Sequence, residues 1–187
     1  QVKEIKLAEQ AFEAYQSVLK VHTRQSAPFV WGLIHYNLAN LQVELLSDNG
    51  EEHLRLEAIE NFQIALEIYK AELFPYQFAD IYIKLGDLYL GQAAGDQAES
   101  IEHAIQAYEF AQEEISKLVE VIPESLILTR LGGAYSQRLR GDRAKNVTLA
   151  LAYYKQCLAM MHKNNDQEAI EDLELKIVRL QSGQRIN

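Results

Sequence analysis

The residues of this chain that could do chemistry are one cysteine, five histidines and several acidic pairs. Cys157 is the single cysteine, which excludes an internal disulfide and a cysteine zinc cluster. A nucleophilic cysteine needs a neighbouring base, and His162 is the nearest candidate along the chain. Because Cys157 stands in an apolar helical pattern, we interpret it as a small buried thiol and expect no cysteine catalysis.

The other polar residues form no motif of a catalytic, metal or cofactor site. The histidines are scattered without metal-ligand spacing, at positions 22, 35, 53, 103 and 162. The chain has no glycine-rich phosphate loop, no His-Glu-x-x-His and no nucleophile elbow. Acidic pairs such as Glu51-Glu52 and Glu113-Glu114 are typical of solvated helix faces. We therefore expect a protein that is not an enzyme and that binds no cofactor.

Charge and hydropathy limit the classes of partner. The net charge of −9 argues against nucleic acid, whose phosphates need a basic face. Basic residues cluster only between Arg138 and Lys145, which we interpret as a solvated turn. No apolar run approaches the roughly 18–20 residues that span a bilayer. The lone cysteine fits a reducing compartment. We expect a cytoplasmic protein with neither a nucleic-acid nor a membrane partner.

Two stretches of the chain begin alike, GDQAESIEHAIQAYEFA at Gly95 and GDRAKNVTLALAYYKQC at Gly141. Each carries a small–aromatic–small triplet at i, i+4 and i+7, which is one stripe of a helix. The three complete triplets are 46 residues apart, and a fainter copy precedes them by 47 residues. The triplets are Ala11, Tyr15 and Val18; Ala58, Phe62 and Ala65; Ala104, Tyr108 and Ala111; and Ala150, Tyr154 and Cys157.

A second pattern lies between the triplets at the same spacing. Its members are Leu38-Ala39, Leu85-Gly86 and Leu131-Gly132, in segments that open with Pro28, Pro75 and Pro123. Proline is tolerated at the first turn of a helix, where its missing N–H costs nothing. The turns DNGEE, GDQAE and GDRAK follow, and in the middle turn Asp96 is placed to cap the next helix. The two patterns together predict that each unit is a helical hairpin, made of a first helix, a turn and a second helix. The sequence Arg-Gly-Asp at residues 140–142 is similar to an adhesion motif, but in this register it is predicted to form the turn of a hairpin.

The pattern predicts an all-α fold of eight helices in a single domain over residues 1–187. Predicted helices are 3–24, 28–46, 52–72, 76–92, 97–119, 124–139, 144–162 and 166–181. In this organisation 3–24 is the remnant of a second helix, repeats occupy about 28–72, 75–119 and 123–162, and 166–181 departs from the template as a capping helix. Because the chain starts without methionine inside a helical pattern, we expect a fragment of a longer protein.

These motifs resemble the tetratricopeptide repeat. In that family's pattern, a Leu-Gly pair in the first helix is followed three residues later by a tyrosine. The second helix then carries an alanine, an aromatic residue four positions on and a small residue three positions further. The matches are Leu85, Gly86, Tyr89, Ala104, Tyr108, Ala111 and Pro123, then Leu131, Gly132, Tyr135, Ala150, Tyr154 and Cys157. The resemblance covers about residues 25–165 and implies a right-handed superhelical solenoid of antiparallel hairpins. Its inner wall would be made by the first helices.

The repeat length departs from the family, being 46–47 residues here against about 34. Long variants with a Gly-Asp turn resemble repeats of cyanobacterial and other bacterial multidomain proteins. In those proteins such arrays often precede a caspase-like protease (CHAT) domain.

The resemblance implies a peptide-binding groove on the first helices. Residues there that the packing does not use are expected to line it: Leu33, Tyr36, Asn37, Asn40, Glu44, Asp80, Ile83, Lys84, Asp87, Leu126, Thr129, Arg130, Gly133 and Gln137. Of these, Leu33, Tyr36, Ile83 and Leu126 would be the apolar anchors.

Chaperone-binding members of the family use a two-carboxylate clamp, which this chain does not reproduce. Asn40 and Arg130 match two clamp positions. Tyr36, Asp87 and Leu126 stand where lysine, asparagine and lysine are expected. Because Asp87 would repel a C-terminal carboxylate, we reject the clamp for this chain.

The expected function is a non-catalytic scaffold that binds a peptide or protein segment in the groove. One alternative is a regulatory array that controls an attached enzyme, such as a CHAT protease, in the same polypeptide. Another is self-association into a homo-oligomer through terminal hairpins, since the N-terminal helix lacks its partner.

Overall fold

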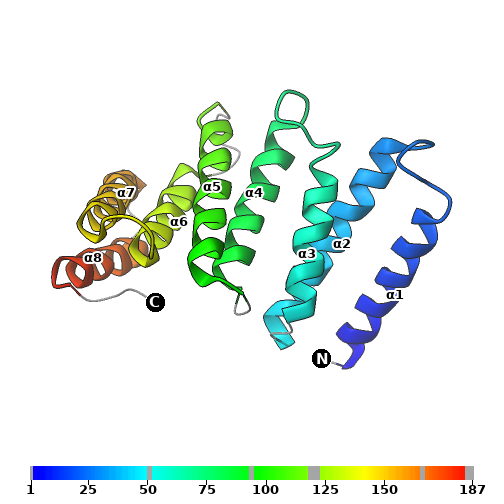
Figure 1. Cartoon of the computed structure of the whole chain (residues 1–187), viewed down its shortest axis with the longest axis horizontal. Coiled ribbons are helices and arrows are strands. Elements are labelled where there is room, and N and C mark those ends of the chain that lie inside the picture. The colour runs from blue at the N-terminus through cyan, green and yellow to red at the C-terminus, as the bar shows by residue number, and fades with distance from the viewer. Residues whose placement is uncertain (1, 50–51, 93–94, 118–122, 165–166, 184–187) are drawn as a thin grey trace. The chain divides into compact units, whose positions relative to one another are not determined.

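The computed structural model describes residues 2–49, 52–92, 95–117, 123–164 and 167–183. Every regular element in these ranges is a helix, so the fold is all-α, as predicted. The helices, labelled in Figure 1, are α1 (Val2–Leu19), α2 (Pro28–Asn49), α3 (Glu52–Ala65), α4 (Pro75–Leu90), α5 (Gln97–Ile115), α6 (Glu124–Gln137), α7 (Arg143–Asn164) and α8 (Gln167–Gln181).

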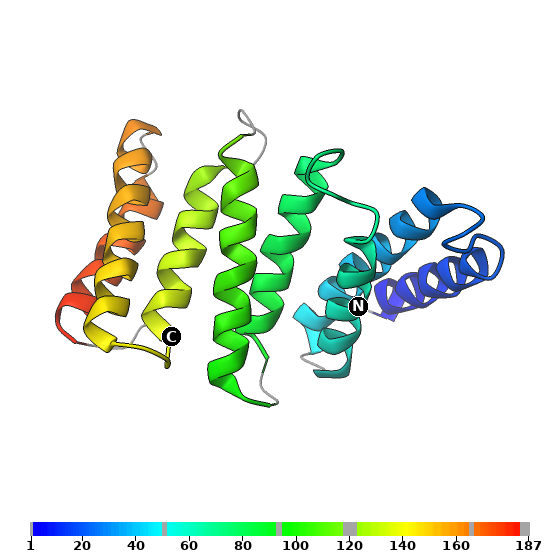
Figure 2. The ribbon, with the colours of Figure 1, turned by 45° about the horizontal axis from the view of Figure 1, so that its top comes forward.

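The helices pack into two compact units. One unit holds α1, α2, α3 and the part of α4 that ends at Ile81. The other holds the part of α4 from Tyr82 onward, together with α5, α6, α7 and α8. Within the first unit α2 packs on both α1 and α3. Within the second, α5 packs on α6, α6 on α7 and α7 on α8, in an order that both views display (Figures 1 and 2). The single domain predicted over residues 1–187 stays a prediction.

The turn residues set the helix starts as the sequence predicts. Pro28 and Pro75 are the first residues of α2 and α4, and Pro123 caps α6. Gly95 and Gly141 have φ angles of 93° and 79°, which glycine adopts without the steric cost of a Cβ atom. The aspartate after each glycine caps a helix: the Asp96 carboxylate accepts hydrogen bonds from the N–H groups of Ala98 and Glu99.

Two predicted helix ends are wrong because local contacts stop the helix early. α1 ends at Leu19, not at residue 24. The backbone N–H of Thr23 donates to Ser26 Oγ, and the N–H of Ser26 donates to Thr23 Oγ1, at 3.0 and 3.2 Å. Such side-chain bonds offer the backbone an alternative to the helical ladder. The predicted end of the fifth helix, residue 119, lies outside the described residues.

α3 ends at Ala65, seven residues before the predicted end at residue 72. Its last turn tightens, since the N–H of Ile68 donates to the carbonyl of Ala65, and the chain then leaves the helix. The departure lets Tyr69 contact both Tyr36 and Phe74 edge-on, with ring centroids 5.7 and 5.3 Å apart. Tertiary packing of aromatic rings therefore overrides local helix propensity here.

The predicted stripes form the core. All nine residues of the three complete small–aromatic–small triplets are buried, from Ala58 to Cys157. In the second unit each tyrosine of a stripe lies against the glycine of the paired first helix. A Cβ atom on Gly132 would lie 2.5 Å from Cε1 of Tyr154, and one on Gly86 would overlap the ring of Tyr108. Glycine is therefore required for these rings to pack on the helix backbone.

The Gly132–Tyr154 contact gives a prediction with a matched control on the next residue. Gly132→Ala should destabilise the fold by about 1–3 kcal/mol, because the added methyl overpacks the site. A Cβ on Gly133 would meet only Tyr154 Oη, at 3.7 Å, which is an ordinary contact. Gly133→Ala should therefore stabilise by up to about 1 kcal/mol through helix propensity. Chemical denaturation of both variants measures the difference, and equal effects would contradict the contact.

Candidate functional site

In the first unit Tyr36 contacts two other predicted site residues, Asp80 and Asn40. The hydroxyl of Tyr36, on α2, donates to Asp80 Oδ2, on α4, at 2.6 Å. Its ring packs edge-on against Phe62 and Tyr69. Burial, followed by the bond to Asp80, raises the pKa of this tyrosine well above its usual range. Tyr36 therefore has a structural role, and contact with a ligand stays a prediction.

The other predicted residues of α2 differ in exposure. Leu33 and Glu44 are exposed, whereas Asn37 and Asn40 are half-buried. Asn40 Nδ2 donates to the backbone carbonyl of Tyr36 at 2.9 Å, one turn earlier in the same helix. Leu33 and Tyr36 are the two predicted anchors on this helix, and Leu33 has the larger exposed fraction.

In the second unit the structure brings Asp87 and Arg130 together. Arg130 Nε lies 2.7 Å from Asp87 Oδ1, and both side chains are about two-fifths exposed, at 40% and 41%. The contact is an ion pair without a hydrogen bond, since the buried Nε has no hydrogen-bond acceptor in the described part of the chain. The ion pair links α4 to α6.

Asp87 is held from the core side by Tyr108. The Tyr108 hydroxyl donates to Asp87 Oδ1 at 2.6 Å, and the ring is the one that packs on Gly86. Burial raises the pKa of Tyr108, and the neighbouring Asp87 carboxylate raises it further. One carboxylate oxygen therefore contacts both the phenol and the guanidinium, so the position of Arg130 depends on a core aromatic residue.

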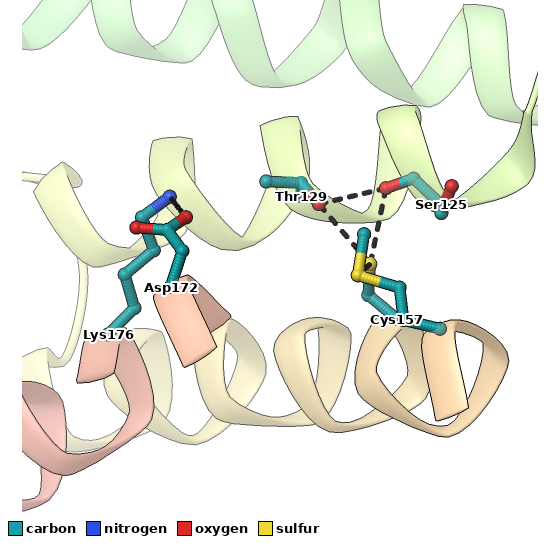
Figure 3. A network of polar contacts seen from close by, with 6 residues as sticks. Ser125, Thr129, Cys157, Asp172 and Lys176 are labelled. Carbon is teal, nitrogen blue, oxygen red and sulfur yellow. Dashed lines mark hydrogen bonds and ion pairs between the residues drawn. The ribbon is translucent and has the colours of Figure 1, made fainter. Parts of the chain in front are cut away.

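Ile83 and Thr129, two more predicted site residues of the second unit, serve packing. Ile83 is buried and offers little surface to a ligand. Thr129 Oγ1 donates to the carbonyl of Ser125 at 2.9 Å and lies 3.3 Å from Cys157 Sγ, a contact between α6 and α7 that Figure 3 shows. Binding roles for both residues stay predictions.

The remaining predicted residues of the second unit are half-buried. Lys84, Leu126, Gly133 and Gln137 share this intermediate exposure. Gln137 Nε2 lies 3.4 Å from the carbonyl of Gly133, within the same helix.

Cys157 is the buried thiol that the sequence predicts. It is fully buried, and burial raises the pKa of its thiol while the contact with Thr129 opposes the rise. A raised pKa disfavours the thiolate, which is the nucleophilic form. His162, its candidate base, is exposed. This environment favours a packing role for Cys157.

The basic segment from Arg138 to Lys145 is engaged within the fold. Arg138 makes two hydrogen bonds to the Glu102 carboxylate, at 2.8 and 2.7 Å, and this holds the pKa of Glu102 below its usual value. Arg140 lies 3.5 Å from Asp96. Asp142 accepts a hydrogen bond from the N–H of Lys145, which confirms the turn predicted for the tripeptide.

Sequence reasoning missed the contacts by which Tyr135, a buried residue of α6, joins this helix to α5 and α7. Tyr135 donates its hydroxyl to Glu109 at 2.8 Å and stacks on Tyr153, while Arg138 lies over the ring of Tyr135. The repeat placed Tyr135 on a first helix but gave no signal for partners 26 residues earlier in the chain.

Comparison with protein-family models, curated proteins and solved structures gives no match. Among the described residues, no cluster of three or more histidine, cysteine or acidic side chains could hold a metal ion. No helix in the same part of the chain has the length and apolar character needed to cross a membrane.

The Tyr108–Asp87 bond predicts a pH dependence. A phenol whose pKa is raised by folding keeps its proton in the native state while the unfolded state loses it, so stability falls as pH rises above the ordinary value of 10.0. Tyr108→Phe should therefore show a shallower loss of unfolding free energy between about pH 9 and about pH 11. Urea titrations at both pH values measure the slope.

Tyr76→Phe is the matched control for this experiment, since Tyr76 is an exposed tyrosine on α4. Its slope should follow the wild type. A Tyr108→Phe slope equal to that of the wild type would contradict the burial of the phenol beside Asp87.

Proposed function

We propose that this chain is a tetratricopeptide-type array that binds a peptide or protein segment on its first helices, without catalysis. The proposal includes a right-handed superhelical solenoid, whose inner wall the first helices form. It is supported by the hairpins α2–α3 and α6–α7 and by the buried stripe that recurs in α3, α5 and α7. One hairpin cannot bury both of its faces, so stacking of such units is expected.

The observation that carries the binding proposal is the Arg130–Asp87 ion pair. Arginine presents a planar fork that can grip a carboxylate or two carbonyl oxygens at once. Arg130 keeps 40% of its side-chain surface exposed while Asp87 fixes its Nε edge. Because Asp87 is itself bonded to Tyr108, the guanidinium is positioned before any ligand arrives, which lowers the entropy lost on binding.

The same pair limits the chemistry of the ligand. Asp87 keeps 41% of its side-chain surface exposed beside the guanidinium, so a ligand meets both signs of charge within one site. A free carboxylate is attracted by Arg130 and repelled by Asp87. An extended peptide that offers backbone carbonyls to Arg130 and a basic side chain to Asp87 satisfies both groups, and we propose this class of ligand.

The test uses a displayed random-peptide library selected against the whole chain, followed by titration calorimetry of the selected peptides. Arg130→Ala should weaken binding by about 1–3 kcal/mol, as for a lost charged hydrogen-bond partner. It should change the free energy of unfolding by less than about 1 kcal/mol, because the ion pair is partly exposed. Selected sequences should be enriched in lysine or arginine.

Arg140→Ala is the matched control, since it removes the same charge from a turn where Arg140 is half exposed beside Asp96. Its affinity should equal that of the wild type. Failure to select any peptide, or equal losses for Arg130→Ala and Arg140→Ala, would reject the proposed site.

A further inference from the structure

The two oxygen atoms of the Asp87 carboxylate have different surroundings. The Tyr108 hydroxyl donates to Oδ1 at 2.6 Å, and Arg130 Nε lies 2.7 Å from the same atom. In the described part of the chain no hydrogen bond reaches Oδ2. Asp87 nevertheless keeps 41% of its side-chain surface exposed. The carboxylate therefore offers one open oxygen to a ligand, rather than two.

The groups that close Oδ1 are held in place by packing. Tyr108 is fully buried, and its ring lies on Gly86 in the helix that carries Asp87. Because a single methyl group at Gly86 would overlap this ring, the ring is fixed at close contact and its hydroxyl stays at Oδ1. Arg130 occupies the other approach to Oδ1, with its Nε buried. A nitrogen atom from a ligand finds no room at this oxygen.

The two basic side chains that a peptide can carry differ in what they need from a carboxylate. The guanidinium of arginine is a planar fork, and its strongest pairing places two N–H groups on the two oxygens of one carboxylate. The ammonium of lysine is a compact charge with three N–H donors on a flexible stem. It pairs with a single oxygen and directs its other donors to water or to the peptide. With Oδ1 closed, Asp87 suits the ammonium better than the fork.

We propose that the basic residue of the ligand that binds Asp87 is a lysine, and that Tyr108 sets this preference by occupying Oδ1. The inference rests on the proposed function, since it assigns one residue of the basic peptide that binds beside Arg130. Tyr108 is a positioning residue, because it contacts the carboxylate from the core side and is itself buried. A peptide with arginine in the same place keeps its charge but loses one of the two hydrogen bonds of the fork.

Arg130 adds to the discrimination between the two basic residues. Its side chain is 40% exposed beside Asp87, and its nearest contact with the carboxylate is at Oδ1. A ligand guanidinium that spanned both oxygens would bring one of its nitrogen atoms to Oδ1, where the Arg130 guanidinium already lies. Like charges at such a separation repel each other. An ammonium bound at Oδ2 carries no second nitrogen to Oδ1, so it avoids most of this repulsion.

The next hairpin supplies a matched comparison for Tyr108. Tyr154 lies on Gly132 as Tyr108 lies on Gly86, and both tyrosines are buried. The hydroxyl of Tyr154 lies near Gly133, which has no carboxylate. Removal of either hydroxyl therefore changes a core phenol in the same kind of packing, but only the change at Tyr108 opens a carboxylate oxygen.

The test uses the peptides selected against the whole chain. A double-mutant cycle between Asp87→Asn and alanine at each basic position of a peptide identifies the position that contacts Asp87. Two peptides, with lysine or arginine at this position, are then titrated calorimetrically. The lysine peptide should bind the wild type about 3- to 10-fold more tightly than the arginine peptide. In Tyr108→Phe, which opens Oδ1, this ratio should fall to about one or reverse.

The ratio of the two affinities within one variant does not depend on the fraction of the chain that is folded, so a loss of stability does not imitate the result. Tyr154→Phe is the control and should keep the wild-type ratio. A wild type that prefers arginine, no basic position coupled to Asp87, or a ratio that is unchanged in Tyr108→Phe or shifts equally in Tyr154→Phe would overturn the inference and leave peptide binding in place. Failure to select any peptide would reject the proposed function and the inference with it.

Discussion

The contact on which the second unit depends is a tyrosine ring lying on the backbone of a glycine in the paired helix. Gly86 receives Tyr108 and Gly132 receives Tyr154, and in both cases a single methyl group would occupy the space of the ring. The contact sets how closely the two helices of a hairpin approach. The buried stripes of small residues above and below each ring are a consequence, since larger side chains would separate the helices again. This requirement explains why the small residue of the first helix and the small–aromatic–small stripe of the second recur every 46–47 residues in the sequence.

The candidate site is built on the same contact. Tyr108 extends beyond Gly86, and its hydroxyl meets Asp87, which in turn holds Arg130. The column that contains Asp87 holds Asn40 in the first hairpin and Gly133 in the third. In the first hairpin the stripe residue is Phe62, which has no hydroxyl to offer. In the third hairpin the core phenol of Tyr154 lies near Gly133, which has no carboxylate to offer. The column therefore joins a core phenol to a carboxylate only at Tyr108 and Asp87, and the candidate site consists of this pair and the neighbouring Arg130.

Much of the helical framework follows from the sequence, because proline, glycine and aspartate fix the helix starts through local backbone chemistry. The early ends of α1 at Leu19 and of α3 at Ala65 were not predictable in this way. The first depends on the hydrogen bonds between Thr23 and Ser26, and the second on the contact of Tyr69 with Tyr36.

The site was predictable only in part. A repeat places Asp87 and Arg130 on successive first helices, and the structure pairs them. The repeat does not show which of the predicted groove residues have side chains that pack into the core. Ile83 and Thr129 belong to the same predicted face, yet Ile83 is buried and Thr129 contacts Cys157. The rotation of a helix about its own axis decides between these outcomes, and a small–aromatic–small pattern does not fix that rotation.

The most direct test of the central contact is a nuclear Overhauser measurement between glycine Hα protons and tyrosine ring protons in the labelled whole chain. The account predicts cross-peaks from Gly86 to Tyr108 and from Gly132 to Tyr154, with ring-current shifts of both glycine Hα resonances. Gly133 is the internal reference, because only the hydroxyl of Tyr154 lies near it, at 3.7 Å from a Cβ position. Gly86 and Gly132 resonances that match Gly133, without cross-peaks to either ring, would contradict the account.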